Sequence, residues 1–436
     1  MTTVLAGAEP EPVPFIGSEA LLVLLVQLAV LLAAAVAAGA LARRIGVPAV
    51  VGELLAGVLL GPSLLGHAWP AAERWLFPSD PAQQNLADAI GQLGVILLVG
   101  LAGAEVDIGF VRRQRRVVAS ISVFAFIIPF AAGVGAALLI PASMRVDGAS
   151  TAALAMMMGT ALSVSAIPVI AKILAEMGYL HRNVGQFILA SASANDAFAW
   201  ILLSITASLA TVGVRTGDIA VSIGATVGVF LVGLLILRPL VRPLLDRCER
   251  AAPAVLIPVC TVLILAAAAL TQALGLEAIL GAFVAGLIIG PRTPALIGPL
   301  TTVTMAVLVP VFLATAGLRV DLTLLADPVI AAVAVGTVAA AAVSKFTGAY
   351  LGARLARQTR WEAAAIGAGL NSRGAVEIVI AMTGLRIGVL SAGAYTVVVI
   401  VAIATSIMAP PLLKRAMRQL TATEEELVRQ ELRTPV

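Results

Sequence analysis

The chain has few charged residues, histidines and cysteines, and each shortage excludes a class of protein. Only 12% of its 436 residues are charged and 60% are hydrophobic, whereas a soluble domain carries about 25% charged residues. A water-facing surface cannot be built from half that supply, so we expect lipid to be the solvent over most of the chain. The two cysteines and two histidines make neither a disulfide framework nor a metal-ligand cluster.

The placement of the basic residues excludes a nucleic-acid-binding protein, because they form short loop clusters instead of one basic face. Residues 1–17 also lack the basic start of a secretory signal peptide and carry Glu9 and Glu11. We interpret them as a short extracytoplasmic lead-in. No motif indicates an enzyme or a resident cofactor.

Long apolar segments, by contrast, are abundant. A membrane-spanning helix needs about 20 apolar residues, and the sequence predicts thirteen such helices. They cover 18–42, 47–66, 87–109, 117–140, 150–176, 183–211, 218–237, 253–272, 276–290, 296–316, 328–351, 361–383 and 392–413. The predicted fold class is therefore an all-α polytopic membrane protein with membrane lipid around it.

The distribution of Lys and Arg predicts the orientation of these helices. Of the 28 basic residues, twenty follow odd-numbered segments, whereas five follow even-numbered ones. Cytoplasmic loops carry the excess of Lys and Arg. We therefore expect an N-terminus outside the inner (cytoplasmic) membrane and a cytoplasmic tail over 414–436.

The odd number of helices allows an internal repeat. A linker helix at 218–237 would separate two six-helix halves of opposite orientation, 18–211 and 253–413, as in many secondary transporters. The stretches GELLAGVLLGP (52–62) and LGAFVAGLIIGP (280–291) are similar, and each lies in the second segment of its half. The sequence thus predicts an inverted repeat.

Charged residues inside the predicted helices indicate the candidate site. A charge at membrane depth costs at least ~2.5–3.5 kcal/mol, so the charges present there are usually functional. The predicted helices contain Glu53, Glu105, Asp107, Asp196, Glu277, Lys345, Arg373 and Glu377. Asp196 lies near the centre of the sixth helix among small residues that permit close helix approach. It is a candidate ion or proton site, with an aspartate hydrogen-bonded to a neighbouring helix as the alternative.

Two segments in matching positions of the two halves are interrupted by small and polar residues. The fifth contains Thr160, Ser163, Ser165 and Pro168, and a proline frees the carbonyl four residues before it. The twelfth reads GAGLNSRGAVEIVIA over 367–381. A pair of interrupted helices in corresponding positions indicates a transport site. An ordinary proline kink remains the alternative for the fifth segment alone.

Lys345 is notable because the chain has only three lysines among its 28 basic residues. A lysine, unlike an arginine, can lose its proton when it is buried. We expect Lys345 to pair with Asp196 and to release it when a cation arrives; a lysine that snorkels to the cytoplasmic face is the alternative. Arg373 is expected to donate to carbonyls freed at the breaks. Glu377, four residues later, is positioned to pair with it.

Several stretches together carry a family resemblance. They are GELLAGVLLGPSLLG (52–66), LGVILLVGLAGAEVDI (93–108), ALSVSAIPVIAKILAEMG (161–178) with SASANDAFAWILL (191–203), GAFVAGLIIGP (281–291) and LNSRGAVEIVIA (370–381). Over roughly residues 20–412 the chain resembles the monovalent cation:proton antiporter-2 family. The resemblance is strongest to the branch with plant cation/proton exchangers and bacterial spore-germination antiporters.

The resemblance implies a core domain in which two broken helices, the fifth and the twelfth, cross at the membrane midplane. It also implies a separate dimerisation domain, a homodimer and an elevator-type movement. Matched to the family motif, Asp196 is the ion-binding aspartate, with Asn195 as its neighbour, and Ser165 lies at the first break. Lys345 is the basic residue of the eleventh helix, and Arg373 belongs to an Arg-Gly pair. Many potassium-efflux relatives append a nucleotide-binding domain, and we expect none here, because about 23 residues follow the last predicted helix.

Together these residues predict an antiporter that exchanges Na⁺ or K⁺ for H⁺. An ionised Asp196 would bind the cation with Asn195 and oxygens of Thr160, Ser163 or Ser165, and its protonation would expel the cation. One central acid favours electroneutral exchange. A channel-like cation efflux system and an exporter or symporter of an organic solute on the same fold remain open.

Overall fold

The computed structural model describes residues 16–78, 80–104, 108–166, 170, 173–174, 177–179, 182–212, 216–251, 253–290, 294–423 and 426. These residues form helices and turns, with no β-strand among them. The predictions for Glu105, Asp107 and Pro168 lie outside the described residues, as do those for residues 1–15 and most of the tail beyond 423.

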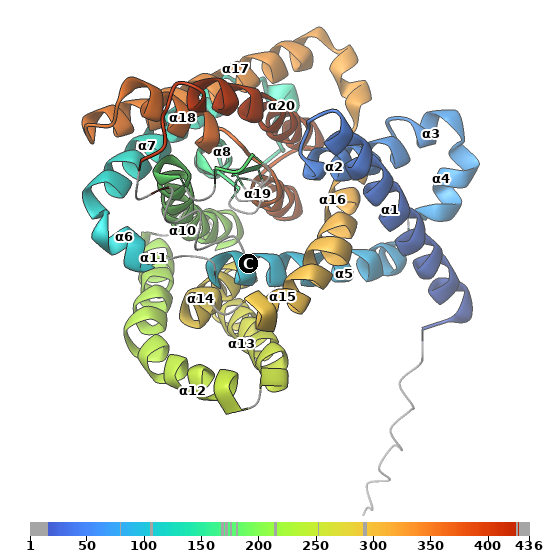
Figure 1. Cartoon of the computed structure of the whole chain (residues 1–436). Helices are drawn as coiled ribbons and strands as arrows, with labels where there is room; N and C mark the ends of the chain where they lie inside the picture. Colours follow the sequence, from blue (N-terminus) through green and yellow to red (C-terminus); the bar gives the residue numbers. More distant parts are fainter. Residues whose placement is uncertain are drawn as a thin grey trace, which may run out of the picture.

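The helices are labelled in chain order in Figure 1. They are α1 (Ser18–Arg44), α2 (Ala49–Leu60), α3 (Leu65–Ala68), α4 (Pro70–Leu76), α5 (Pro81–Ala104), α6 (Ile108–Arg113), α7 (Arg115–Leu139), η1 (Ala142–Met144), α8 (Thr151–Ser163), α10 (Asn183–Val212), α11 (Thr216–Leu231), η2 (Val232–Leu237), α12 (Arg238–Ala251), α13 (Pro253–Ala273), α14 (Ala278–Ile289), α15 (Pro294–Val303), η3 (Thr304–Leu308), α16 (Val309–Leu318), η4 (Leu322–Ala326), α17 (Pro328–Leu355), α18 (Arg360–Leu370), α19 (Ala375–Arg386) and α20 (Ala392–Met417). Of the short elements, η1 and η4 are 3₁₀ helices, and η2 and η3 are π-helical turns.

Ten helices among the described residues are long and apolar enough to cross a membrane. The predicted segments without such a helix are 150–176, 276–290 and 361–383, which contain α8, α14 and the pair α18–α19. Helix α14 has 12 residues and is about 18 Å long, much shorter than a hydrocarbon core of about 30 Å. Its side chains are buried by the surrounding helices, so its ends meet protein instead of lipid.

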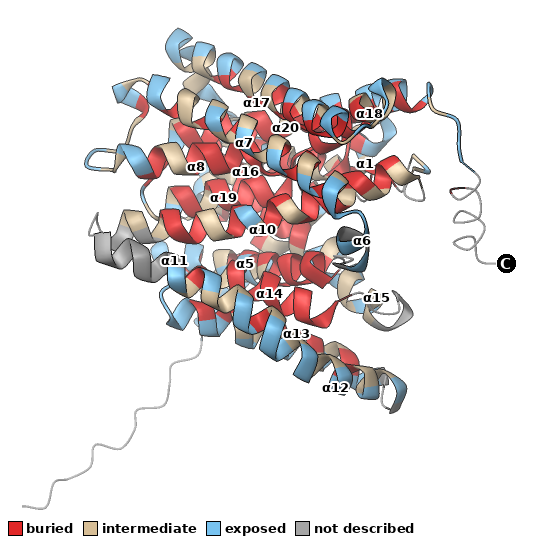
Figure 2. Cartoon of the chain, turned by 90° about the vertical axis from the view of Figure 1, so that its left-hand side faces the viewer, coloured by how far each residue is buried: buried red, intermediate tan, exposed pale blue. Residues whose placement is uncertain are grey.

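Large apolar side chains on the outer faces of the helices confirm lipid as the solvent. Leu139, Val335 and Leu235 are 83%, 70% and 69% exposed, which would be unfavourable over a whole surface in water. Figure 2 shows exposed residues along the outer helices and buried residues towards the centre. The chain is an all-helical, multi-pass membrane protein.

The long helices pack as two groups (Figure 1). The site bundle comprises α7, α8, α10, α17, α18, α19 and α20, and the scaffold bundle comprises α1, α2, α5, α13, α14 and α16. Tyr395 of α20 donates a 2.7 Å hydrogen bond to the Ala316 carbonyl of α16, and Arg386 of α19 pairs with Glu277 at 2.9 Å. Glu277 was expected within a helix, but it is the residue directly before α14, which begins at Ala278.

Glycines allow the scaffold helices to approach each other closely, in the same way at two places. A Cβ on Gly52 would lie 2.3 Å from the carbonyl oxygen of Ala38, and a Cβ on Gly281 would lie 2.1 Å from that of Ala267. No real Cβ tolerates such distances, so only glycine fits. Each residue of the second contact lies 229 positions after its counterpart in the first (38 to 267 and 52 to 281).

Two predicted helices continue furthest beyond their expected bounds, through polar residues. The segment predicted to begin at residue 87 begins at Pro81, where Gln83 is buried and donates to the carbonyl of Ala20 and to the side chain of Gln27. The helix predicted over 218–237 continues through η2 and α12 to Ala251. Hydropathy alone cannot detect helical turns built from polar residues.

Candidate functional site

Two helix breaks meet in the centre of the site bundle. Helix α8 ends at Ser163, and residues 164–166 are not helical. Helix α18 ends at Leu370, and α19 begins at Ala375 after four residues of irregular backbone. The residue before a proline is driven towards extended backbone, and a proline has no N–H to donate. Pro168 therefore favours the first break, while Asn-Ser-Arg-Gly forms the second.

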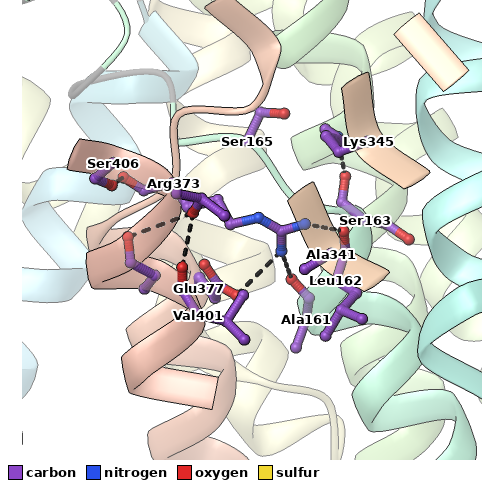
Figure 3. Close-up of polar contacts among 12 residues, drawn as sticks. Ala161, Leu162, Ser163, Ser165, Ala341, Lys345, Arg373, Glu377, Val401 and Ser406 are labelled. Carbon is purple, nitrogen blue, oxygen red and sulfur yellow. Dashed lines mark hydrogen bonds and ion pairs between the residues drawn. The ribbon is translucent and has the colours of Figure 1, made fainter. Parts of the chain in front are cut away.

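Two cationic side chains hold the open end of α8 (Figure 3). Arg373 donates from Nη1 to the carbonyl of Ala161 at 2.8 Å and from Nη2 to that of Leu162 at 2.5 Å. Lys345 donates to the carbonyl of Ser163. These last carbonyls of a helix lack intrahelical partners and carry partial negative charge. Lys345 and Arg373 thus satisfy the carbonyls that the break leaves open.

The same two side chains tie neighbouring helices to the break. Lys345 comes from α17 and also donates to the carbonyl of Ala125 in α7, at 3.0 Å. It is fully buried and does not snorkel to a membrane face. Arg373 pairs with Glu377 at 3.1 Å, and its backbone carbonyl accepts a hydrogen bond from Ser406 of α20. The break is therefore held by groups from four other helical segments.

The predicted hydroxyl groups lie along α8 and at its end. Thr160 donates to the carbonyl of Met156 at 2.7 Å, and Ser163 donates to that of Gly159 at 2.6 Å. Ser165 donates across to the carbonyl of Leu370 at 2.9 Å, which joins the two breaks. A hydroxyl that donates its proton keeps oxygen lone pairs for a further donor or a cation.

Asp196 and Asn195 lie midway along α10, which packs against α7, α8 and α18. Thirteen residues of helix separate Asp196 from the start of α10, a distance of about 20 Å. Asp196 is 1% exposed and Asn195 is fully buried. The Oδ1 atom of Asp196 and both amide atoms of Asn195 have no hydrogen-bond partner. A buried polar group without a partner requires an explanation, such as a bound ion or water.

Four charged groups in this region balance one another. Asp196, Lys345, Arg373 and Glu377 are each at most 1% exposed. Arg373 and Glu377 form a direct ion pair, whereas the structure describes none between Lys345 and Asp196. With all four ionised, two positive and two negative charges cancel. A cation or a proton added to Asp196 therefore leaves the same net charge of +1.

The second break also contains two polar residues that sequence analysis did not assign to the site. Asn371 and Ser372 are each 1% exposed, and Asn371 Oδ1 and Ser372 Oγ have no hydrogen-bond partner. They directly follow Leu370, whose carbonyl accepts from Ser165. The signal was present in the sequence, because two polar residues precede Arg373 inside an apolar segment.

The tail after α20 is bound to the start of the helix that carries Asp196. Glu426 accepts a hydrogen bond from the backbone N–H of Asn183 at 2.7 Å and pairs with Arg182 at 2.9 Å. Arg182 also donates to the carbonyls of Leu420 and Thr421. Burial raises the pKa of Glu426, but the N–H groups of Thr423 and Asn183 and the Arg182 guanidinium outweigh burial and keep this pKa below its usual value. The tail thus caps α10 with a carboxylate.

Replacement of Glu426 by glutamine is expected to loosen this tail. Hydrogen bonds to a charged group contribute about 1.5–3 kcal/mol, so the Thr423 amide, which donates to Glu426 at 2.9 Å, should exchange with solvent roughly 10–100 times faster. Because the pKa of Glu426 is lowered, the stabilisation is complete above the unfolded value of about 4.3 and is lost as the pH falls through the folded value.

Hydrogen exchange measured by mass spectrometry tests this expectation. Glu362→Gln is the matched control, because the described hydrogen bonds of Glu362 are to Thr359 at the start of α18, and it should leave the Thr423 region unchanged. Equal protection in the Glu426 variant and in the unmodified chain would show that the carboxylate does not hold the tail.

Comparison with known proteins places this architecture among ion exchangers. Residues 30–419 match the model of the family described as "Sodium/hydrogen exchanger, transmembrane". The Na(+)/H(+) antiporter NhaS4 of Synechocystis sp. is 32% identical over 91% of this chain and 97% of its own length. The Cation/H(+) antiporter 17 of Arabidopsis thaliana is 29% identical over 90% of this chain, which spans 48% of that relative.

A solved structure agrees at the level of the fold. The sodium proton antiporter MjNhaP1 of Methanocaldococcus jannaschii superposes with a TM-score of 0.64 and 16% identity, over 94% of this chain and 99% of that one. The family match and the relatives confirm the resemblance drawn from the sequence motifs. The chain belongs to the transmembrane sodium/hydrogen exchanger family of cation/proton antiporters.

Proposed function

We propose that this chain exchanges a monovalent cation, Na⁺ or K⁺, for H⁺ across the cytoplasmic membrane, and that both ions use Asp196. The observation that carries the proposal is the carboxylate itself, buried at midspan with Oδ1 free of hydrogen bonds. Membership of a cation/proton antiporter family supports the same reading. An intramembrane carboxylate that faces the interior of a bundle is typical of ion and proton pathways.

The cation ligands proposed are oxygens of Asp196, Asn195 and Ser165, with Thr160 and Ser163 as further donors. Their burial supports this set, since an alkali cation that enters such a site exchanges its water for protein oxygens. We add Asn371 as an oxygen donor from the second break, because its Oδ1 is buried without a partner. Each of these groups supplies a neutral or anionic oxygen, which a hard cation prefers.

Competition between the two ions follows from the charge balance. A cation or a proton on Asp196 gives the four-charge cluster the same net charge, so the two loaded sites meet the same electrostatic barrier. In the unloaded site the ionised carboxylate of Asp196 is buried with Oδ1 unpartnered, and this uncompensated anion makes movement of the empty site unfavourable. This equality favours electroneutral exchange of one cation for one proton.

For the movement itself, we propose that the site bundle is the core domain and that it moves against the scaffold bundle as an elevator. The repeated glycine contacts of α2 with α1 and of α14 with α13 support an inverted repeat with halves 18–211 and 253–413. The scaffold bundle would then provide the dimerisation domain of a homodimer. Lys345 and Arg373 keep the broken helices together while the bundle moves, because they hold the end of α8.

The experiment is cation-driven proton movement in liposomes that contain the purified chain and an internal pH dye. Na⁺, K⁺ and Li⁺ are added in turn, with and without a valinomycin clamp of the membrane potential. We expect Na⁺ or K⁺ to dissipate a preset pH gradient at a rate that the clamp does not change. Cation flux without proton movement would support channel-like efflux instead. Failure of all three monovalent cations to move protons would favour an organic substrate or a channel.

A further inference from the structure

A cavity of ≈490 Å³ lies between the two bundles at the end of the molecule where the basic residues gather. One wall is the end of α1 and the turn that follows it, with Arg43 and Ile45, and it belongs to the scaffold bundle. The other wall is the last part of α20 in the site bundle, with Ile407, Pro411 and Lys414. The cavity is separate from Asp196 and from the helix breaks, none of whose residues line it.

The lining combines two cations with apolar side chains. Arg43 and Lys414 are exposed, and within the described residues neither makes an ion pair. No described acidic residue lines the cavity. The rest of the lining is apolar, with isoleucine, proline, valine, methionine and glycine residues, and Ile45 and Ile407 within it are 71% and 42% exposed. The lining therefore combines positive charge with an apolar surface in one cavity.

These features match one kind of molecule, because the same occupant must be anionic at one end and apolar along its length. A free phosphate would satisfy Arg43 and Lys414 but would leave the apolar walls in contact with water. A neutral acyl chain would cover the walls but would leave the cations unpaired. Basic pockets between transmembrane helices on the cytoplasmic side bind anionic lipid head groups.

We propose that this cavity binds an anionic phospholipid of the cytoplasmic leaflet. Its phosphate is held between Arg43 and Lys414, and its acyl chains lie along the exposed face formed by Ile45 and Ile407. Because one cation comes from each bundle, the lipid bridges the site and scaffold bundles at the membrane surface. The inference requires only the positive-inside orientation of the chain and not the proposed ion exchange.

The test is native mass spectrometry of the delipidated full-length chain, titrated with phosphatidylglycerol, with phosphatidylcholine of the same acyl chains, and with inorganic phosphate. We expect phosphatidylglycerol to bind at one high-affinity position. Each basic residue near the membrane surface contributes about fivefold to affinity, so Arg43→Gln with Lys414→Gln should weaken binding by roughly 25-fold. Arg43→Lys, which keeps the charge, should retain it.

The control variant removes the same charge from the same end of the molecule. Arg354→Gln with Arg360→Gln changes residues outside the cavity and should leave phosphatidylglycerol binding unchanged. If this control weakens phosphatidylglycerol binding equally, the binding depends on general surface charge and the proposal is overturned. Equal binding of phosphatidylcholine, or displacement of the lipid by millimolar inorganic phosphate, would overturn it as well. Transport assays do not enter this test, so its failure and a failure of the exchange proposal are distinguishable.

Discussion

Asp196→Asn is expected to abolish proton-coupled cation exchange while the protein still folds. Asparagine has nearly the size of aspartate, so the packing of α10 against α7, α8 and α18 is preserved. The amide cannot take up a proton, so proton transport through this site ends. It also cannot neutralise a cation, so a loaded site would carry one more positive charge than in the unmodified chain.

The size of the loss follows from that extra charge. An uncompensated charge at membrane depth costs at least ~2.5–3.5 kcal/mol, which corresponds to a cation transfer rate roughly 100-fold lower. The measurement is the initial rate of dye response in liposomes after a Na⁺ or K⁺ pulse. Size-exclusion chromatography and the thermal midpoint of the same preparation report folding, and both should remain close to those of the unmodified chain.

Asp321→Asn is the matched control, because the same chemical change occurs at the half-buried residue that caps η4. It should exchange ions at the normal rate. Normal exchange by the Asp196 variant would show that Asp196 is not the site shared by the cation and the proton. Cation flux without proton movement in that variant would instead support the channel-like alternative.

Arg373→Met is expected to lower the free energy of unfolding by about 3–5 kcal/mol, the usual cost of removing one partner from a buried ion pair. Arg373 and Glu377 are both fully buried, so methionine fills the space but leaves the Glu377 carboxylate without its partner. The carbonyls of Ala161 and Leu162 also lose their donors. Two unsatisfied groups at the end of α8 then add to the unpaired charge.

The measurement is unfolding by denaturing detergent in mixed micelles, followed by circular dichroism. Arg386→Met is the control, because its ion pair with Glu277 is half exposed on the arginine side, and such pairs contribute about 0–1 kcal/mol. Adding Glu377→Gln to Arg373→Met should recover part of the loss, since the unpaired carboxylate is gone. If Arg373→Met costs no more than Arg386→Met, the guanidinium does not stabilise the broken helices.

Local sequence alone predicted the apolar helices and the positions of the two breaks. Helix formation in lipid depends on a continuous run of apolar residues, and interruption depends on proline, glycine and polar residues within that run. Both are properties of neighbouring residues, so 150–176 and 361–383 could be recognised without a structure. Asp196 could be singled out for the same reason, because a carboxylate is conspicuous in an apolar helix.

The partners of the charged residues were decided only by the tertiary structure. Lys345 binds the carbonyl of Ser163, 182 residues away, and Glu426 binds Arg182 from 244 residues away. No local pattern encodes such pairs, because they depend on which helix faces lie together after packing. From the sequence, Lys345 could either snorkel to the membrane surface or point into the protein. The packing of α17 against α7 and α8 directs it into the protein. Apolar sequence thus determined where the chain crosses the membrane, whereas helix packing determined which buried charge meets which carbonyl.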